Sequence, residues 1–193
     1  MEAITDLGDS ALLLPGAAFV FVTLWLVRAR RRAIAWAVAI AFCGGTMVVL
    51  KIGLVPCGKP WLGRELANPS GHAALSATFY GSLALLALDG IAGVAGRAIL
   101  LAVAALAIVG IAVSRIAIGV HTSPEVALGL GVGLLSIVVF DIVRGRGPVP
   151  RLALPLIVLL LLGGAAALYG RRVGAEDMIR RIAVIFYHWT GLC

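Results

Sequence analysis

Six long apolar stretches constrain the fold of this chain more than any other feature. They cover residues 11–27, 33–50, 72–88, 98–113, 124–140 and 152–168, and they hold no Asp, Lys or Arg and no Glu except Glu125. A helix needs about 20 apolar residues to cross a bilayer, and slightly shorter runs are completed by flanking residues. With 62% hydrophobic and 13% charged residues, the chain cannot bury these stretches in one soluble core. The sequence therefore predicts an all-α, polytopic membrane bundle of six transmembrane helices, folded as a single domain over residues 1–193.

The charged residues between the stretches orient the predicted bundle. The first short loop, residues 28–32, holds four arginines, and basic loops of this kind stay on the cytoplasmic side. Alternation then places residues 89–97 and 141–151 on the same inner side, and residues 51–71, residues 114–123 and both chain ends outside. The net charge of +7 is typical of a protein that contacts lipid headgroups, and the sequence holds no basic patch of the nucleic-acid-binding type.

The two ends of the chain have different expected roles. The first ten residues are acidic and lack a basic region, so the first stretch should remain as a membrane anchor, capped by Asp9 or Ser10. Residues 173–193 mix charged and aromatic side chains, which favours an interfacial helix lying in the headgroup plane; a frayed terminus is the alternative. His188 in this tail is interpreted as an interfacial side chain.

The three cysteines do not form a pattern of metal ligands. Cys43 lies in an apolar stretch, Cys57 in a loop and Cys193 at the last position. Cys43 is interpreted as a small packed residue. Cys57 and Cys193 fall on the same predicted outer face, where an oxidising compartment would permit a disulfide.

Glycines inside the stretches indicate where helices approach each other closely. Small residues let two helix backbones come near, as in many membrane bundles. The glycines interpreted in this way are Gly81, Gly129, Gly131 and Gly133.

The outer segment at residues 51–71 is long for so compact a chain, and long connections commonly carry function. It ends in Ser70 and Gly71 at the start of an apolar stretch, where backbone N–H groups and a hydroxyl are suited to hold phosphate. The alternative is that Ser70 only caps the following helix. The segment contains three cations and one anion, which are Lys51, Lys59, Arg64 and Glu65.

The second outer segment, residues 114–125, carries Arg115, His121 and Glu125. Taken alone, these would be an interfacial anchor, a loop histidine and a first-turn acid favoured by the helix dipole. Glu125 follows His121 by four residues, so one helical turn would bring carboxylate and imidazole onto one face if the helix begins early enough. Together the two outer segments supply cations, two histidines and a carboxylate on one membrane face, which are the groups that phosphoryl transfer requires.

These residues resemble the signatures of the type 2 phosphatidic acid phosphatase (PAP2) superfamily. Residues 69–72 read Pro-Ser-Gly-His, like the second signature, PSGH, and residues 114–125 match the Ser-Arg to His spacing of the third, S-R-x5-H-x3-D, but end in Glu125. The first signature, K-x6-R-P, is present as Lys51 followed after seven residues by Lys59 and a proline. Because Lys lacks the bidentate fork of Arg, Arg64 is a second candidate for that position.

The resemblance implies a metal-independent membrane lipid phosphatase that needs no cofactor and works through a covalent phosphohistidine. It implies that His121 is the nucleophile, that Glu125 orients its ring, and that His72 is the general acid and then the base. The groups implied to hold the phosphate oxygens are Lys51, Lys59, Ser70, Arg115 and the backbone N–H of Gly71.

The implied substrate is the phosphomonoester or diphosphate of a lipid that enters from the bilayer. Undecaprenyl diphosphate, phosphatidylglycerophosphate, phosphatidic acid and lipid A are the candidate classes, and the compact chain slightly favours a small head group. The expected partners are this substrate and membrane lipids, with no nucleic acid. The expected location is a bacterial inner membrane with the site facing the periplasm. The sequence does not specify an oligomeric state.

Three other functions stay open at this stage. A lipid phosphotransferase would use the same histidines. A small lipid transporter or flippase would need polar groups near the bilayer midplane and broken helices, whereas the charges here lie at the ends of the stretches. An inactive relative that only binds phospholipid heads is the third.

Overall fold

The structure is a computed structural model that describes residues 2–54, 64–91, 93–145 and 153–168, together with residues 182, 185, 189 and 190. Its regular elements are helical, and no strand occurs among the described residues. The elements are α1 (Glu2–Asp6), α2 (Ser10–Leu26), α3 (Arg30–Leu54), the 3₁₀ helix η2 (Arg64–Leu66), α4 (Gly71–Leu88), α5 (Val94–Ala117), α6 (Ser123–Arg144) and α7 (Ala153–Leu168). The predicted all-α class is confirmed for this part of the chain.

Five helical segments are long and apolar enough to cross a membrane. They are Ile4–Leu26, Arg30–Leu54, Gly71–Leu88, Val94–Ala117 and Ser123–Arg144. The sixth predicted stretch is also helical, but α7 has only 16 residues and its apolar part is Leu154–Gly164. The predicted count of six spans is therefore not confirmed. The predicted interfacial helix at residues 173–193 falls almost wholly outside the described residues.

Side-chain caps fix where three of the helices begin. Asp9 starts α2, Ser70 starts α4 and Thr122 starts α6, and each side chain accepts a hydrogen bond from a backbone N–H two or three residues later. Such caps satisfy N–H groups that a helix cannot satisfy internally. The prediction that Asp9 or Ser10 caps the first span is confirmed for Asp9. Ser70 caps α4, as the alternative to a phosphate-binding role predicted.

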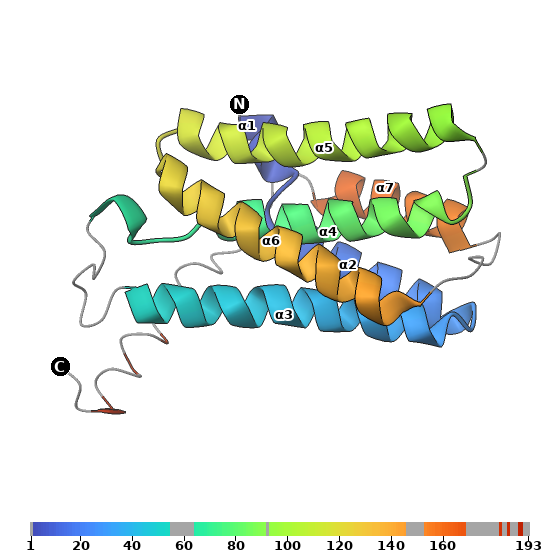
Figure 1. The fold of residues 1–193 in the computed structure, drawn as a ribbon, viewed down its shortest axis with the longest axis horizontal. Helices are drawn as coiled ribbons and strands as arrows, with labels where there is room; N and C mark the ends of the chain where they lie inside the picture. The colour runs from blue at the N-terminus through green and yellow to red at the C-terminus, as the bar shows by residue number, and fades with distance from the viewer. Residues whose placement is uncertain are drawn as a thin grey trace.

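Helix α4 lies at the centre of the bundle and packs against α3, α5 and α6. Helix α6 crosses α4 obliquely and also packs along α3, while α2 packs against α3 and α7 (Figure 1). The short α1 lies against α5. Because the helices alternate in direction, α3 and α5 end where α4 and α6 begin, so four helix termini meet at one end of the bundle.

The bundle interior is held by aromatic packing around Trp36 of α3. Trp36 is 1% exposed, and its indole N–H donates to the carbonyl of Ala17 in α2 at 3.0 Å. Phe79 of α4 and Phe140 of α6 meet its ring edge to face, with centroids 5.3 and 6.1 Å away. One side chain thus connects four helices, and edge-to-face pairs of this kind add about 0.5–1.5 kcal/mol each beyond area burial.

Glycines determine how closely α4 and α6 approach. A Cβ on Gly129 would collide with the carbonyl oxygen of Ser70, and one on Gly133 would lie 2.5 Å from Cβ of Ala77. Gly81 is equally tight against Ile137. The predicted close packing is confirmed for Gly81, Gly129 and Gly133. It is wrong for Gly131, where a Cβ would meet nothing within 4 Å, because this glycine points away from α4.

The buried cysteine behaves as the sequence predicted. Cys43 is 1% exposed and packs with Met47, Ala74 and Val132 in a small cluster between α3, α4 and α6. Cys57 and Cys193 lie outside the described residues, so the disulfide between them stays untested.

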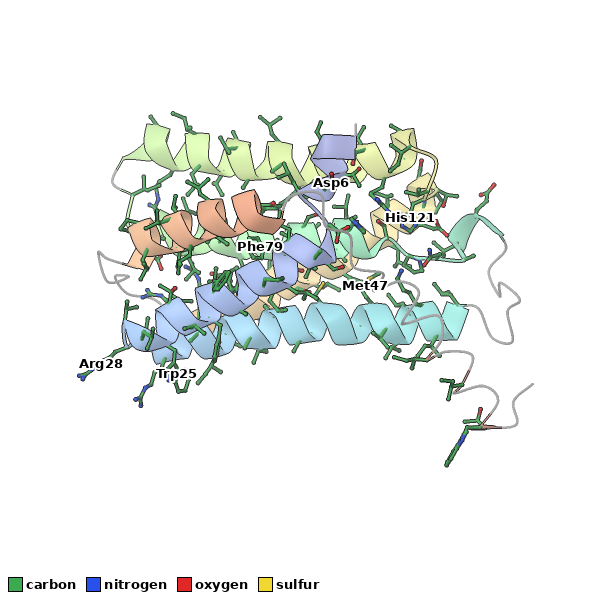
Figure 2. All side chains as sticks on the ribbon, turned by 180° about the vertical axis from the view of Figure 1, so that it is seen from behind. Asp6, Trp25, Arg28, Met47, Phe79 and His121 are labelled. Atoms are coloured by element: carbon green, nitrogen blue, oxygen red, sulfur yellow. The ribbon has the colours of Figure 1, made fainter. Side chains whose placement is uncertain are left out.

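A polar network connects α3, α4 and α6 at one end of the bundle. This end is opposite to the one where α3 and α5 end and α4 and α6 begin. Asp89, which follows α4, accepts hydrogen bonds from Arg32 at 3.1 Å and from Arg144 at 3.0 Å. Arg144 also pairs with Asp141 at 2.8 Å. The segments predicted to be cytoplasmic therefore meet at one end, and Figure 2 shows Arg28 there and His121 toward the opposite end.

Candidate active site

The turn between α5 and α6 places His121. Helix α5 ends at Ala117 with Ile118 as its C-cap, and Gly119 follows with φ +72°, a left-handed conformation that glycine adopts without steric cost. The reversed chain is then held by the His121 backbone N–H, which donates to the carbonyl of Arg115 at 3.3 Å. His121 is 6% exposed as a result.

His121 and Glu125 are paired, although not through a shared helical turn. His121 precedes the cap residue Thr122, so the helix begins too late for the predicted i, i+4 arrangement on one helical face. The contact is made by a capping box instead, in which Thr122 accepts from the Glu125 N–H and Glu125 accepts from the Thr122 N–H. This turn leaves His121 Nδ1 at 3.1 Å from Oε2 of Glu125.

Three donors converge on the Glu125 carboxylate. Oε2 faces His121 Nδ1 and the Thr122 N–H, both at 3.1 Å, and Oε1 accepts from the Asn68 N–H at 2.5 Å. Glu125 is only 4% exposed. A buried carboxylate with this many donors has a fixed position, so the imidazole that it contacts is also fixed.

The two outer segments predicted to act together are joined by hydrogen bonds. Besides the Asn68 contact, the Ser70 N–H donates to the Glu125 carbonyl at 3.1 Å, and the Thr122 hydroxyl donates to the carbonyl of Glu65. These bonds hold the beginning of α4 against the beginning of α6. Ser70 is fully buried there, and its Oγ accepts from the Ala73 N–H at 3.4 Å.

The cations of the site come from the last turns of α3 and α5. Lys51 donates to Oδ1 of Asn68 at 2.9 Å, and its Cε would be 4.0 Å from a Cβ on Gly71, so it lies over the start of α4. Arg115 is 7% exposed, which is unusual for a cation. Lys59 lies outside the described residues, and Arg64 begins η2.

His72 is the second residue of α4 and has a neighbour that sequence reasoning missed. Its Nε2 is 3.6 Å from Oδ2 of Asp9, and the side chains of His72 and Asp9 are 14% and 13% exposed. The sequence identified Asp9 only as a cap, and no local pattern connects it to a residue 63 positions later. Thr122 was also missed, although the Thr-x-x-Glu spacing of a capping box was visible in the sequence.

Within the described residues, no group of three or more His, Cys, Asp and Glu side chains is arranged to hold a metal ion. The polar groups that the described residues bring to this end of the bundle include two histidines, each with a carboxylate neighbour, and the cations Lys51 and Arg115. These are groups that hold an anion and move protons.

The five membrane-length helices define the protein as a helical membrane protein, and its histidine–carboxylate site lies at one end of the bundle. The sequence matches the PAP2 superfamily over residues 46–147, which is more than half of the chain and includes every site residue predicted from the sequence. The chain belongs to this superfamily, and membership supports an activity of the phosphatase type.

A bacterial relative extends the similarity beyond the family match. It is a Klebsiella pneumoniae protein described as "Uncharacterized 22.5 kDa protein in cps region", 32% identical over 153 residues that cover 78% of this chain and 72% of the relative. No solved structure matches the chain with significance.

Proposed function

We propose that this protein is a metal-independent lipid phosphatase that acts through a phosphohistidine on His121. Membership of the PAP2 superfamily supports the reaction class. The observation that carries the mechanism is the buried contact of 3.1 Å between His121 Nδ1 and Glu125. A carboxylate on one ring nitrogen favours the tautomer that carries its proton there, so Nε2 is left with the lone pair that attacks phosphorus.

The first proposed step forms the covalent intermediate. The lone pair of His121 Nε2 makes a bond to phosphorus while the bond between phosphorus and the leaving oxygen breaks. Glu125 stabilises the positive charge that the ring acquires, because its carboxylate accepts a buried, charge-assisted hydrogen bond from the Nδ1–H group. His72 donates a proton to the leaving oxygen.

The second proposed step releases phosphate. Water attacks phosphorus, His72 takes the proton of that water, and the bond between Nε2 and phosphorus breaks with its electrons returning to His121. Positive groups around the phosphate stabilise the charge that develops in both steps. A hydroxyl that accepts a capping bond still donates its own proton, so capping and phosphate binding are compatible for Ser70. The proposed phosphate ligands are Lys51, Ser70, Gly71, Arg115 and either Lys59 or Arg64.

The proposed substrate is a lipid with a phosphomonoester or diphosphate head. The site lies at one end of helices whose outer surfaces are apolar, so a substrate would reach it from the bilayer. The Lys51 and Arg115 cations favour an anionic head group. Undecaprenyl diphosphate, phosphatidylglycerophosphate, phosphatidic acid and lipid A phosphates meet this description. A bacterial inner membrane with the site on the periplasmic face is the proposed location, argued from the arginine-rich loop at residues 28–32.

Phosphate release from purified protein tests the proposal. Wild-type protein in detergent and EDTA is given each candidate lipid, alongside His121→Ala and His72→Ala. We expect release by the wild type, background release by His121→Ala and a loss of about 10²–10⁴-fold in His72→Ala. His188→Ala changes the third histidine and is the matched control, expected to stay active.

Each alternative gives a different result in the same experiment. Transfer of phosphate to an added lipid alcohol in place of release indicates the phosphotransferase. Folded protein that binds the lipids without release or transfer indicates a transporter or a phospholipid-binding protein. Activity lost in EDTA and restored by a divalent cation contradicts the metal-independent scheme.

A further inference from the structure

The N-terminal segment is built into the active-site end of the bundle. Thr5 of α1 shares a buried hydrogen bond of 2.6 Å with Ser114, the residue before Arg115. The Tyr80 hydroxyl of α4 donates to the carbonyl of Leu7 at 2.8 Å. A Cβ on Gly8 would lie 2.6 Å from Ile111 of α5, so the segment packs closely. These contacts fix the chain just before Asp9 against α4 and α5.

The Asp9 carboxylate uses its two oxygens for two different contacts. Oδ1 accepts from the Ala11 N–H at 2.7 Å and caps α2, while Oδ2 is 3.6 Å from Nε2 of His72. Both side chains are largely buried, so the interaction is weakly screened by water. The cap holds the carboxylate in place, and the carboxylate in turn faces the histidine.

His72 therefore has the same kind of neighbour as His121. Each imidazole has one ring nitrogen near a buried or largely buried carboxylate: Glu125 for His121 and Asp9 for His72. The two carboxylates come from different parts of the chain. Asp9 lies before residue 46, where the family match begins, so no signature assigns it a role.

We infer that Asp9 is a positioning residue for His72, an inference that rests on the proposed function. Asp9 lies beside Nε2 of His72 and favours the protonated imidazolium ring. In the first step the imidazolium gives one proton to the leaving oxygen and becomes neutral; in the second, the neutral ring takes a proton from the attacking water. Among the described residues, the other charged groups at this end include two cations, Lys51 of α3 and Arg115 of α5. They also include the acids Asp6 of α1 and Glu65 of η2, and the His121–Glu125 pair.

Two substitutions separate this role from capping. Asn and Ser cap helices about as well as Asp, so Asp9→Asn and Asp9→Ser keep α2 but remove the charge beside His72. Asp141→Asn removes one acid at the far end of the bundle and is the matched control. Each variant is assayed for kcat/KM against pH with two lipid phosphates of equal chain length, one an alkyl ester and the other a nitrophenyl ester whose leaving group needs no proton.

The expected result is specific to the substrate that needs an acid. Both Asp9 variants should lose about tenfold in kcat/KM on the alkyl ester and about twofold or less on the nitrophenyl ester, with unchanged thermal stability. The alkaline limb of the alkyl-ester profile should move to lower pH by about one unit, because removing a carboxylate makes a nearby imidazolium lose its proton more easily.

Two results would overturn the inference while the proposed function stands. Wild-type profiles for both Asp9 variants would show that the contact does not act on His72. Equal losses on both esters would assign Asp9 a purely structural role. If the wild type releases no phosphate from any lipid, the proposed function is wrong, and the inference about Asp9, which rests on it, is wrong as well.

Discussion

Replacing Glu125 by Gln tests the hydrogen bonds that hold the proposed nucleophile. The carboxylate accepts from His121 Nδ1 and Thr122 N at Oε2 and from Asn68 N at Oε1. An amide has only one oxygen, so in either orientation its NH₂ group faces at least one of these donors. Glu125→Gln therefore cannot satisfy all three donors that Glu125 satisfies.

The size of the effect follows from these contacts. A hydrogen bond to a charged group contributes about 1.5–3 kcal/mol, and if that stabilisation is lost from the transition state, kcat falls about 10- to 150-fold. The substrate does not touch Glu125 in the proposed mechanism, so KM should change little. A buried donor left without an acceptor costs about 1–3 kcal/mol, which should also lower the midpoint of thermal unfolding.

The assay is phosphate release in detergent over a range of substrate concentrations, paired with thermal unfolding of the same samples. Glu125→Asp is the matched control, because it keeps the charge and both acceptor oxygens and restores the acid of the family signature. It should retain more activity than Glu125→Gln. Wild-type kcat in Glu125→Gln, with the fold intact, would refute the claim that this carboxylate supports His121.

Two further predictions concern parts of the bundle away from the reacting groups. Asp89→Asn removes the charge shared by Arg32 and Arg144. The free energy of unfolding, followed by thermal unfolding, should fall by about 1.5–3 kcal/mol, while kcat stays near the wild-type value. A large loss of kcat in protein that remains folded would contradict this prediction. Gly133→Ala places a methyl group against α4 and should lower the free energy of unfolding by about 1–3 kcal/mol. Gly131→Ala faces open space, so thermal unfolding should show unchanged or slightly higher stability. Equal effects of the two alanines would argue against the helix packing described.

Sequence reasoning succeeded where a physical constraint is local or repeated. The apolar stretches predicted the helices, since bilayer thickness sets their length. The spacing of Arg115, His121 and Glu125 predicted that these residues lie close together, because they share one turn and its flanking helix ends. The buried Cys43 and the tight Gly133 followed from small residues within apolar helices.

The predictions failed where the outcome depends on tertiary packing or on exact helix boundaries. Gly131 has the same local pattern as Gly133, and only the rotation of α6 against α4 separates them. The predicted contact between His121 and Glu125 is present, but a capping turn makes it in place of a helical turn, because α6 begins at Ser123, after the histidine. The approach of Asp9 to His72 depends on how α1 lies on α5, which no local pattern encodes.

The most direct test of the central claim is to trap the phosphoenzyme. Wild-type protein is mixed with a lipid whose terminal phosphate is radiolabelled and quenched within one turnover in alkaline detergent, where phosphohistidine survives. The account predicts protein-bound label that is stable to alkali, labile to acid and located on His121, and absent in His121→Ala. Release of phosphate without any labelled wild-type protein, or label that persists in His121→Ala, would contradict it.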